Sequence, residues 1–296
     1  MAYKFTCDLS YFVDFPDAAK KCPKSRLITQ PNLGLLETAF SDTTDPPSTS
    51  WDRFRTRIEE LNHAGPPSVS FKLVYVVRHG LGVHNVVEAK VGRRAWDEYW
   101  SHLEGDGEIS WVDAKLTEDG ASKMRAVGAQ WAEWTKTQCL PVPGTIYTSP
   151  LARCLETTKL VFSNVMGENG RNLAPVVKEL LRERLTSHTC DKRSTRSWIS
   201  QHYPGFILEP GFEEADILWQ ADRVETDWEH RARTQRVFED IFDHAKSPII
   251  ALVTHSYTVS AILEVVGAPH FRVSEGTVFP LLVRAEKKDV VAGNRS

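Results

Sequence analysis

The residues best suited to chemistry in this chain are an arginine and two histidines that follow apolar runs. Arg78 and His79 come directly after residues 73–77, and His255 follows the apolar run 249–253. Guanidinium groups bind anions with fixed geometry, and imidazole acts as a nucleophile, acid or base near neutral pH. Open α/β sheets place their ligand sites at the carboxyl ends of strands. These residues therefore predict an anion site with a reactive imidazole.

The elements that position these residues alternate between strands and helices from residue 71 onward. A short apolar run bounded by turn residues is typical of a buried strand, and Gly80 ends the first one. Such alternation predicts an α/β domain with a parallel sheet. The expected strands are 73–77, 145–148, 176–181, 249–253 and 277–283, and the expected helices are 151–165, 227–246 and one from His255 to Gly267. The expected core side of helix 227–246 consists of Trp228, Ala232, Gln235, Phe238, Ile241 and Phe242.

The first 70 residues differ in pattern from the rest of the chain. We expect an N-terminal extension, 1–70, that packs on the core, followed by a domain over 71–296. Residues 42–50 are rich in turn formers. Apolar residues then recur at intervals of three and four, which predicts an amphipathic helix that Ser50 is placed to cap. These apolar residues are Trp51, Phe54, Ile58 and Leu61.

Composition argues against several classes of protein. The chain has 36 basic and 39 acidic residues and a net charge of −3, so a nucleic-acid binder that relies on phosphate neutralisation is not expected. No apolar stretch is long enough for a membrane span, and the start lacks the apolar core of a signal peptide. The five cysteines show no C-x-x-C spacing. We therefore expect reduced thiols in a cytoplasmic protein.

Five stretches resemble, in order, the signatures of the histidine phosphatase superfamily, also called phosphoglycerate-mutase-like, branch 1. They are Arg-His-Gly at 78–80 with Asn85 after it, Leu-Thr-x-x-Gly at 116–120, Ser-Pro-Leu-x-Arg-x-x-x-Thr at 149–157, Leu-Arg-Glu-Arg at 181–184 and Val-Thr-His-Ser at 253–256. Thr117 in the second stretch is expected to cap a helix. The resemblance implies an α/β fold, a three-layer α/β/α sandwich with a mostly parallel central sheet, here with an N-terminal extension.

The resemblance also implies that His79 is a nucleophile that forms a phosphohistidine. Its other ring nitrogen needs an acceptor to fix the tautomer, and the carbonyl of Gly80 is a candidate. Glu183 is implied as the proton donor to the leaving oxygen, which requires burial or the phosphate charge to keep it protonated. Positive neighbours would favour the ionised form, so we expect at least one of Arg182 and Arg184 to point away.

The remaining implied roles concern binding of the phosphate. Arg78 and Arg153 are implied to hold the phosphoryl oxygens, because a guanidinium group meets them bidentately. His255, if protonated, adds a third positive donor, and Asn85 offers an uncharged amide donor. Further candidate substrate contacts are His84, Ser256, Lys192 and Arg193.

Two further groups of residues invite a role in the site. Residues 188–193 contain His, Cys and Asp, but zinc sites usually recruit paired ligands from a second stretch, and none is evident. We expect no metal and no cofactor. Trp96, Trp100 and Trp111 are candidates for the mouth of the pocket, where they would favour an apolar or ring-bearing substrate.

These features together predict a metal-independent phosphatase acting on a small organic phosphate or diphosphate monoester. Leu81 stands where glycolytic mutases of the family carry Glu or Gln, which favours the fungal and plant phosphatase-like members. Two alternatives stay open: a phosphoglycerate-type mutase, and a non-catalytic interaction module on the same fold. The expected partner is a small phosphorylated substrate, with no nucleic acid and no membrane, and the oligomeric state is left open.

Overall fold

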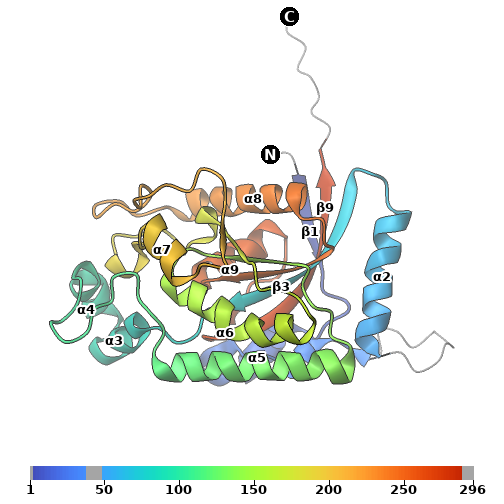
Figure 1. Ribbon diagram of the computed structural model, residues 1–296, viewed down its shortest axis with the longest axis horizontal. Coiled ribbons are helices and arrows are strands. Elements are labelled where there is room, and N and C mark those ends of the chain that lie inside the picture. The colour runs from blue at the N-terminus through green and yellow to red at the C-terminus, as the bar shows by residue number, and fades with distance from the viewer. Residues whose placement is uncertain (1–2, 38–48, 289–296) are drawn as a thin grey trace, which may run out of the picture.

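The computed structural model describes residues 3–37 and 49–288 of the chain (Figure 1). Residues 42–48 of the expected loop lie outside the described residues. The strands are β1 (Tyr3–Asp8), β2 (Arg26–Leu27), β3 (Val69–Arg78), β4 (Thr145–Thr148), β5 (Val176–Val177), β6 (Ile207–Leu208), β7 (Ile249–Thr254), β8 (Arg272–Val273) and β9 (Val278–Lys287). The α-helices are α1 (Phe15–Lys21), α2 (Ser50–Ala64), α3 (Val83–Val91), α4 (Arg93–Glu98), α5 (Glu118–Gln138), α6 (Ala152–Glu168), α7 (Arg196–His202), α8 (Asp227–His244) and α9 (Ser256–Val265).

A seven-stranded sheet runs through the middle of the molecule, in the order β1-β9-β3-β7-β4-β5-β6. The neighbours from β3 to β6 are all parallel, whereas β9 pairs antiparallel with β1 and with β3. Figure 1 shows α5 and α6 on one side of the sheet and α8 on the other. The expected three-layer α/β/α sandwich with a mostly parallel sheet is therefore confirmed.

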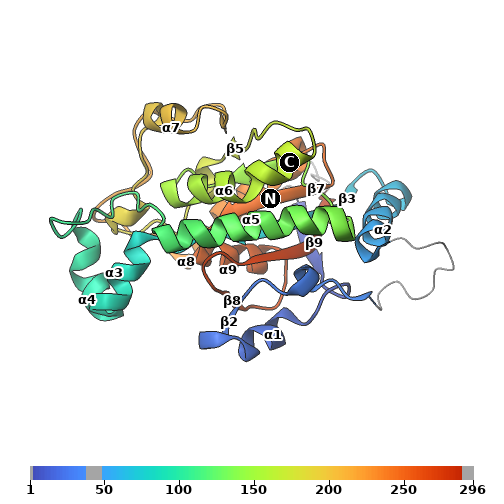
Figure 2. The ribbon, with the colours of Figure 1, turned by 60° about the horizontal axis from the view of Figure 1, so that its bottom comes forward.

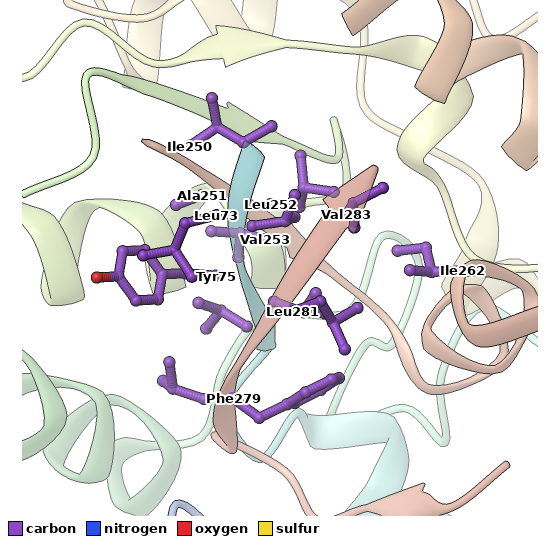
Figure 3. Close-up of a cluster of buried hydrophobic side chains, with 14 of the residues drawn as sticks. Leu73, Tyr75, Ile250, Ala251, Leu252, Val253, Ile262, Phe279, Leu281 and Val283 are labelled. Carbon is purple, nitrogen blue, oxygen red and sulfur yellow. The ribbon is translucent and has the colours of Figure 1, made fainter. Parts of the chain in front are cut away.

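The centre of the core lies where β3, β7 and β9 pack against the helices. Strand β7 is buried along its whole length, which is typical of a parallel strand covered on both faces. Figure 3 shows Leu73 of β3, Leu252 of β7 and Leu281 of β9 gathered in one apolar cluster, with Ile262 of α9 beside it. This packing holds the ends of β3 and β7 in fixed positions, and those ends carry the predicted site.

The N-terminal residues take part in the main sheet and in a small second one. Strand β1 is an edge strand that pairs with β9, with Tyr3 opposite Lys287. A separate two-stranded parallel sheet joins β2 to β8, and Figure 2 shows it next to α1. The division of the chain into two parts at residue 70 stays a prediction.

Three local expectations are wrong. Thr49, not Ser50, caps α2, because the Thr49 side chain accepts from the backbone N–H of Asp52 and Ser50 is already helical. Trp228 does not face the core: it is 74% exposed in the first turn of α8, where it borders a surface cavity. Only the first two residues of the expected strand 176–181 pair as β5.

Two expectations from composition can be compared with the described residues. All five cysteines are free. Within residues 3–37 and 49–288, no helix combines the length and the apolar character needed to cross a membrane.

A close contact between α5 and the turn after β3 positions the first motif. Thr117 caps α5, as expected, by accepting from the backbone N–H of Gly120 at 3.0 Å. A Cβ at position 120 would overlap the carbonyl oxygen of Leu81, and that same oxygen accepts from the backbone N–H of Thr117 at 2.9 Å. Glycine at 120 therefore allows α5 to approach the turn that follows His79.

We expect Gly120→Ala to lower the free energy of unfolding by about 1–3 kcal/mol, because the backbone of α5 or of the turn must move. Gly167→Ala in α6 is the control, since no atom lies within 4 Å of its added Cβ, and it should stay within about 1 kcal/mol of the parent. Urea unfolding measures both variants. Equal stability of the two variants would contradict this account of the contact.

Candidate active site

The carboxyl ends of adjacent strands meet at one edge of the sheet. Strands β3 and β7 pair in parallel with Arg78 opposite Thr254, and the backbone N–H of His79 donates to the Thr254 carbonyl at 3.0 Å. This register places His79 and His255, distant in sequence, with ring centroids 5.1 Å apart.

A cavity of about 840 Å³ opens at this edge, and seven of the ten predicted site residues line it. These are Arg78, His79, His84, Asn85, Arg153, Glu183 and Ser256. His255 does not line the cavity: it is fully buried, and its ring lies edge-on to that of His79. A second cavity of about 530 Å³, next to Trp228 of α8, contains none of the ten.

His79 is held in one orientation and one tautomer. Its Nδ1 lies 2.7 Å from the carbonyl oxygen of Gly80, and because a carbonyl only accepts, Nδ1 carries the proton and Nε2 has the free lone pair. The ring is 2% exposed. Burial, with Arg153 and Arg78 adding, lowers the pKa of His79 well below its usual range. The imidazole is therefore neutral and its Nε2 is available as a nucleophile.

Arg153 is fixed by three neighbours in the buried floor of the site. Its Nε donates to Nδ1 of His255 at 3.2 Å, its Nη1 donates to the Cys190 carbonyl at 2.7 Å, and its Nη2 pairs with Oδ1 of Asp191 at 2.8 Å. These contacts orient the guanidinium group.

The same contacts decide the charge of His255. Its Nδ1 accepts from Arg153 and so has no proton, which leaves the proton on Nε2, 2.7 Å from Oγ of Ser149. Burial, followed by Arg153, lowers the pKa of His255 well below its usual range. These contacts favour neutral His255, and the condition for a third positive donor is not met in this arrangement.

Arg78 is anchored by a backbone carbonyl and by a carboxylate. Its Nη1 donates to the Val273 carbonyl at 2.7 Å, and its Nη2 pairs with Oε1 of Glu275 at 2.7 Å. Among the residues that the structure describes, buried Nε of Arg78 has no hydrogen-bond partner. A buried donor without a partner is costly, so an anion in the cavity would satisfy it.

The carboxyl group of Glu183 lies against the first turn of α9. Oε1 accepts from the backbone N–H groups of Tyr257 at 3.1 Å and Thr258 at 3.2 Å, and Oγ of Ser256 donates to Oε2 at 3.3 Å. Burial raises the pKa of Glu183 above its ordinary value, and the charge of Asp191 raises it further. Both effects shift Glu183 toward the protonated form that a general acid requires.

A buried ion pair between Arg233 and Glu225 holds the backbone around Glu183. Arg233 donates to the carbonyls of Leu180 at 2.8 Å and Glu183 at 2.9 Å, and its Nη2 pairs with Glu225 at 2.7 Å. Glu225 in turn accepts from the backbone N–H of Leu185 at 3.0 Å. The segment that carries the acid is therefore held on both sides of Glu183.

Three smaller predicted contacts also face the cavity. Asn85 is the third residue of α3, and its Oδ1 accepts from the Gly82 backbone N–H at 3.1 Å, which orients the amide group. His84 is buried, and within the described residues its Nδ1 has no partner. Ser256 donates to Glu183, so its hydroxyl orients the acid as well as lining the cavity.

Neither arginine beside Glu183 forms an ion pair with its carboxyl group, and Arg182, which does not line the cavity, points away as expected. Arg182 makes a bidentate pair with Asp216, with both N–O distances 2.6 Å. Arg184 pairs with Asp227 at 2.6 Å and lies over the ring of Tyr257.

The structure does not bring two of the predicted substrate contacts, Lys192 and Arg193, to the cavity. Arg193 is buried and donates to Glu179 and to the carbonyls of Glu213 and Ala215, so its guanidinium group is part of the core. Lys192 lies over the ring of Trp219, 5.1 Å from its centroid, and does not line the cavity.

The ligand atoms of His188, Cys190 and Asp191 lie within 4.8 Å of one another, as in a metal site. However, Oδ1 of Asp191 binds Arg153 and its Oδ2 accepts from Thr186 at 2.9 Å. Both carboxylate oxygens of Asp191 are therefore already engaged, so these residues fit an ion poorly, and the absence of a metal stays a prediction.

The tryptophans expected at the mouth of the pocket form a small core instead. Trp96 and Trp111 are both buried, with ring centroids 5.7 Å apart, and Trp100 packs on Trp111 at 6.3 Å. Only Trp96 among the three lines the cavity.

Sequence reasoning missed the residues that hold the arginines and the second histidine. Asp191 lies inside the stretch 188–193, and Ser149 opens the motif 149–157, so both stretches carried a usable signal. Glu275 carried none, because its partner Arg78 is far away in the chain.

Comparison with known proteins agrees with this geometry. Residues 74–273 match the family model of the histidine phosphatase superfamily (branch 1). A "Probable phosphoglycerate mutase" of Arthroderma benhamiae is 41% identical over 268 residues, 89% of this chain and 80% of that protein. "Probable phosphoglycerate mutase PMU1" of Saccharomyces cerevisiae is 32% identical over 246 residues, 76% of this chain and 83% of that protein.

Among solved structures, the chain is similar to a phosphoglycerate mutase from Bacillus anthracis, with a TM-score of 0.46 and 15% identity, covering 72% of this chain and 88% of that one. The family model spans more than half of the chain, and its motifs supply the histidines and arginines gathered at the sheet edge. The chain belongs to the histidine phosphatase superfamily, branch 1.

Proposed function

We propose that the protein is a metal-independent phosphatase that hydrolyses a small organic phosphate monoester through a phosphohistidine on His79. The observation that carries this proposal is the contact of Nδ1 with the Gly80 carbonyl, which leaves Nε2 unprotonated and facing a cavity lined by Arg78 and Arg153. A neutral nucleophile beside fixed cations is what attack on a phosphoryl group requires.

In the first step, the lone pair on Nε2 of His79 attacks phosphorus in line with the bond to the leaving oxygen. That P–O bond breaks as the N–P bond forms, and the proton of the Glu183 carboxyl group goes to the leaving oxygen. Arg78, Arg153 and the amide of Asn85 offer donors to the phosphoryl oxygens, where charge develops in the transition state.

In the second step, water attacks phosphorus and the N–P bond breaks. The carboxylate of Glu183 takes a proton from that water, inorganic phosphate leaves, and His79 returns to its neutral form. The acid of the first step is thus the base of the second. The two pKa shifts support this division of labour, because the pKa of Glu183 is raised and that of His79 is lowered.

A mutase remains the second candidate, since the curated relatives carry mutase names. A mutase must keep water from the phosphohistidine. The cavity is bordered by side chains that remain in contact with solvent, Tyr257 at 41% and Arg184 at 25% exposure. Access of water favours hydrolysis.

We also place the reaction in the cytoplasm, which the five free cysteines support.

His79→Ala is expected to abolish release of phosphate from p-nitrophenyl phosphate, because the only route proposed passes through Nε2. His244→Ala is the matched control, since that ring is 76% exposed on α8, and it should retain parental activity. Phosphate release measures both. If His79→Ala and the parent release phosphate at equal rates, the nucleophile is misassigned.

Incubation with phosphoglycerates separates the phosphatase from the mutase: isomer interconversion without phosphate release would support the mutase.

Glu183→Gln should slow hydrolysis of an alkyl phosphate by about 10²–10⁴-fold and that of p-nitrophenyl phosphate far less, because a good leaving group needs no proton. In the parent, kcat/KM for the alkyl phosphate should fall as the pH rises through the raised pKa of Glu183, where the acid loses its proton. Dividing kcat/KM of the parent by kcat/KM of Glu183→Gln at each pH removes the effect of substrate ionisation, because that effect is the same for both proteins. Equal slowing of both substrates, or a pH-independent ratio, would rule out Glu183 as the acid.

A further inference from the structure

One wall of the active-site cavity comes from residues outside the family motifs. Eight arginine and lysine side chains and five carboxylates line the cavity, although the whole chain has a net charge of −3. The surplus positive charge is therefore concentrated at this site. Lys24, Arg26 and Arg272 supply a large part of it, and Lys24 and Arg26 precede the residues 74–273 that match the family model.

The small sheet of β2 and β8 carries Arg26 and Arg272, and Lys24 lies in the short 3-10 turn Pro23–Ser25 directly before β2. Arg26 and Arg272 are direct partners in its parallel register, so their side chains start side by side. The Leu27 carbonyl accepts from the backbone N–H of Ser274 at 2.8 Å and from Oγ1 of Thr277 at 2.9 Å. This two-stranded sheet, called the ribbon below, is therefore fixed to the residues that lead into β9.

The ribbon also reaches the phosphate-binding arginine. Val273, next to Arg272, accepts from Nη1 of Arg78, and Oε1 of Glu275 binds both Arg78 at 2.7 Å and Arg26 at 3.5 Å. Two guanidinium groups that share one carboxylate oxygen lie close together. An anionic group a few bonds from a phosphate on Arg78 would therefore meet Arg26 and its neighbours.

The positive charges of Lys24, Arg26 and Arg272 are only partly compensated by carboxylates. Glu275 serves Arg26 and Arg78 at once. Within residues 3–37 and 49–288, neither Lys24 nor Arg272 forms an ion pair. Lys24 sits in the left-handed region, with φ 56°, a conformation that costs free energy for a residue with a side chain. Cations gathered beside Arg78 and left without counter-charges are suited to an anion.

We propose that Lys24, Arg26 and Arg272 form a second anion subsite, so that the preferred substrate is a phosphate ester with another anionic group near the reacting phosphate. This inference rests on the proposed function and names the substrate class of that site. The second group is a carboxylate or another phosphate, which share the oxygen acceptors that guanidinium and ammonium groups bind. The N-terminal segment thus takes part in substrate selection.

The test is the double variant Lys24→Gln/Arg272→Gln, which leaves Arg26, Glu275 and Arg78 in place. Two matched pairs of substrates separate the two sources of the anion: glycerol 3-phosphate against 3-phosphoglycerate for a carboxylate, and 2-hydroxyethyl phosphate against ethane-1,2-diol bisphosphate for a second phosphate. We expect KM to rise about tenfold to a hundredfold for the member of a pair with the second anion, and to stay within about twofold for the other member.

Lys20→Gln/Arg171→Gln is the control, because it removes the same charge from exposed positions outside the cavity and should change neither KM. The subsite is overturned if both members of each pair are affected equally, if neither is affected, or if the control acts as the double variant does.

Failure of the proposed function is recognised separately, by the absence of phosphate release from every ester with the parent protein. The subsite is then judged by titration calorimetry of 3-phosphoglycerate and glycerol 3-phosphate on His79→Ala, with and without the Lys24 and Arg272 changes. Loss of the preference for 3-phosphoglycerate in the combined variant supports the subsite, and equal affinities for the two ligands before any change overturn it.

Discussion

The hydrogen bond between Nδ1 of His79 and the Gly80 carbonyl is the interaction on which the active site depends. It assigns the proton to Nδ1 and leaves Nε2 with a free lone pair. The Gly80 peptide is itself held, because its N–H donates to Oγ1 of Thr157 at 3.1 Å, and Thr157 donates to the Arg153 carbonyl at 2.7 Å. The motif around Arg153 thus also holds the peptide that orients His79.

The second constraint is the placement of buried charge. Arg78 and Arg153 are both nearly inaccessible to solvent, and an unpaired buried charge would be strongly destabilising. Glu275 and Asp191 compensate their charges, and one backbone carbonyl accepts a further N–H from each guanidinium group. The arginines are therefore positioned before substrate arrives, so little reorganisation is needed when charge develops on the phosphoryl group.

Sequence patterns were sufficient for the fold class and for the residues that stand at strand ends. His79 and His255 could be placed because an apolar run, a breaker and a parallel sheet together define where a strand delivers its last residues. Arg193 and Lys192 could not, because a basic residue in a loop looks the same whether it binds Glu179, covers Trp219 or faces a cavity. The exposure of Trp228 could not be predicted for a related reason. Helix periodicity indicates which face of a helix is apolar, but not how far along the helix the neighbouring element covers that face.

The contribution of the N-terminal segment was equally unreadable from sequence. Its link to the site runs through β2, a strand of two residues, and through Glu275, which pairs with residues far from it along the chain. Contacts of this kind depend on which strands become neighbours in three dimensions, and a short strand leaves no periodic signal. They became visible only once the register of β2 and β8 was known.

The most direct test of the account is the site of phosphorylation on the ring of His79. The protein is mixed with p-nitrophenyl phosphate, quenched during turnover in alkaline denaturant, which preserves phosphohistidine, and examined by phosphorus-31 NMR and peptide mapping. The account predicts a single phosphohistidine at His79 with phosphorus on Nε2. Phosphorus on Nδ1, on another residue, or on no residue during active turnover would contradict it.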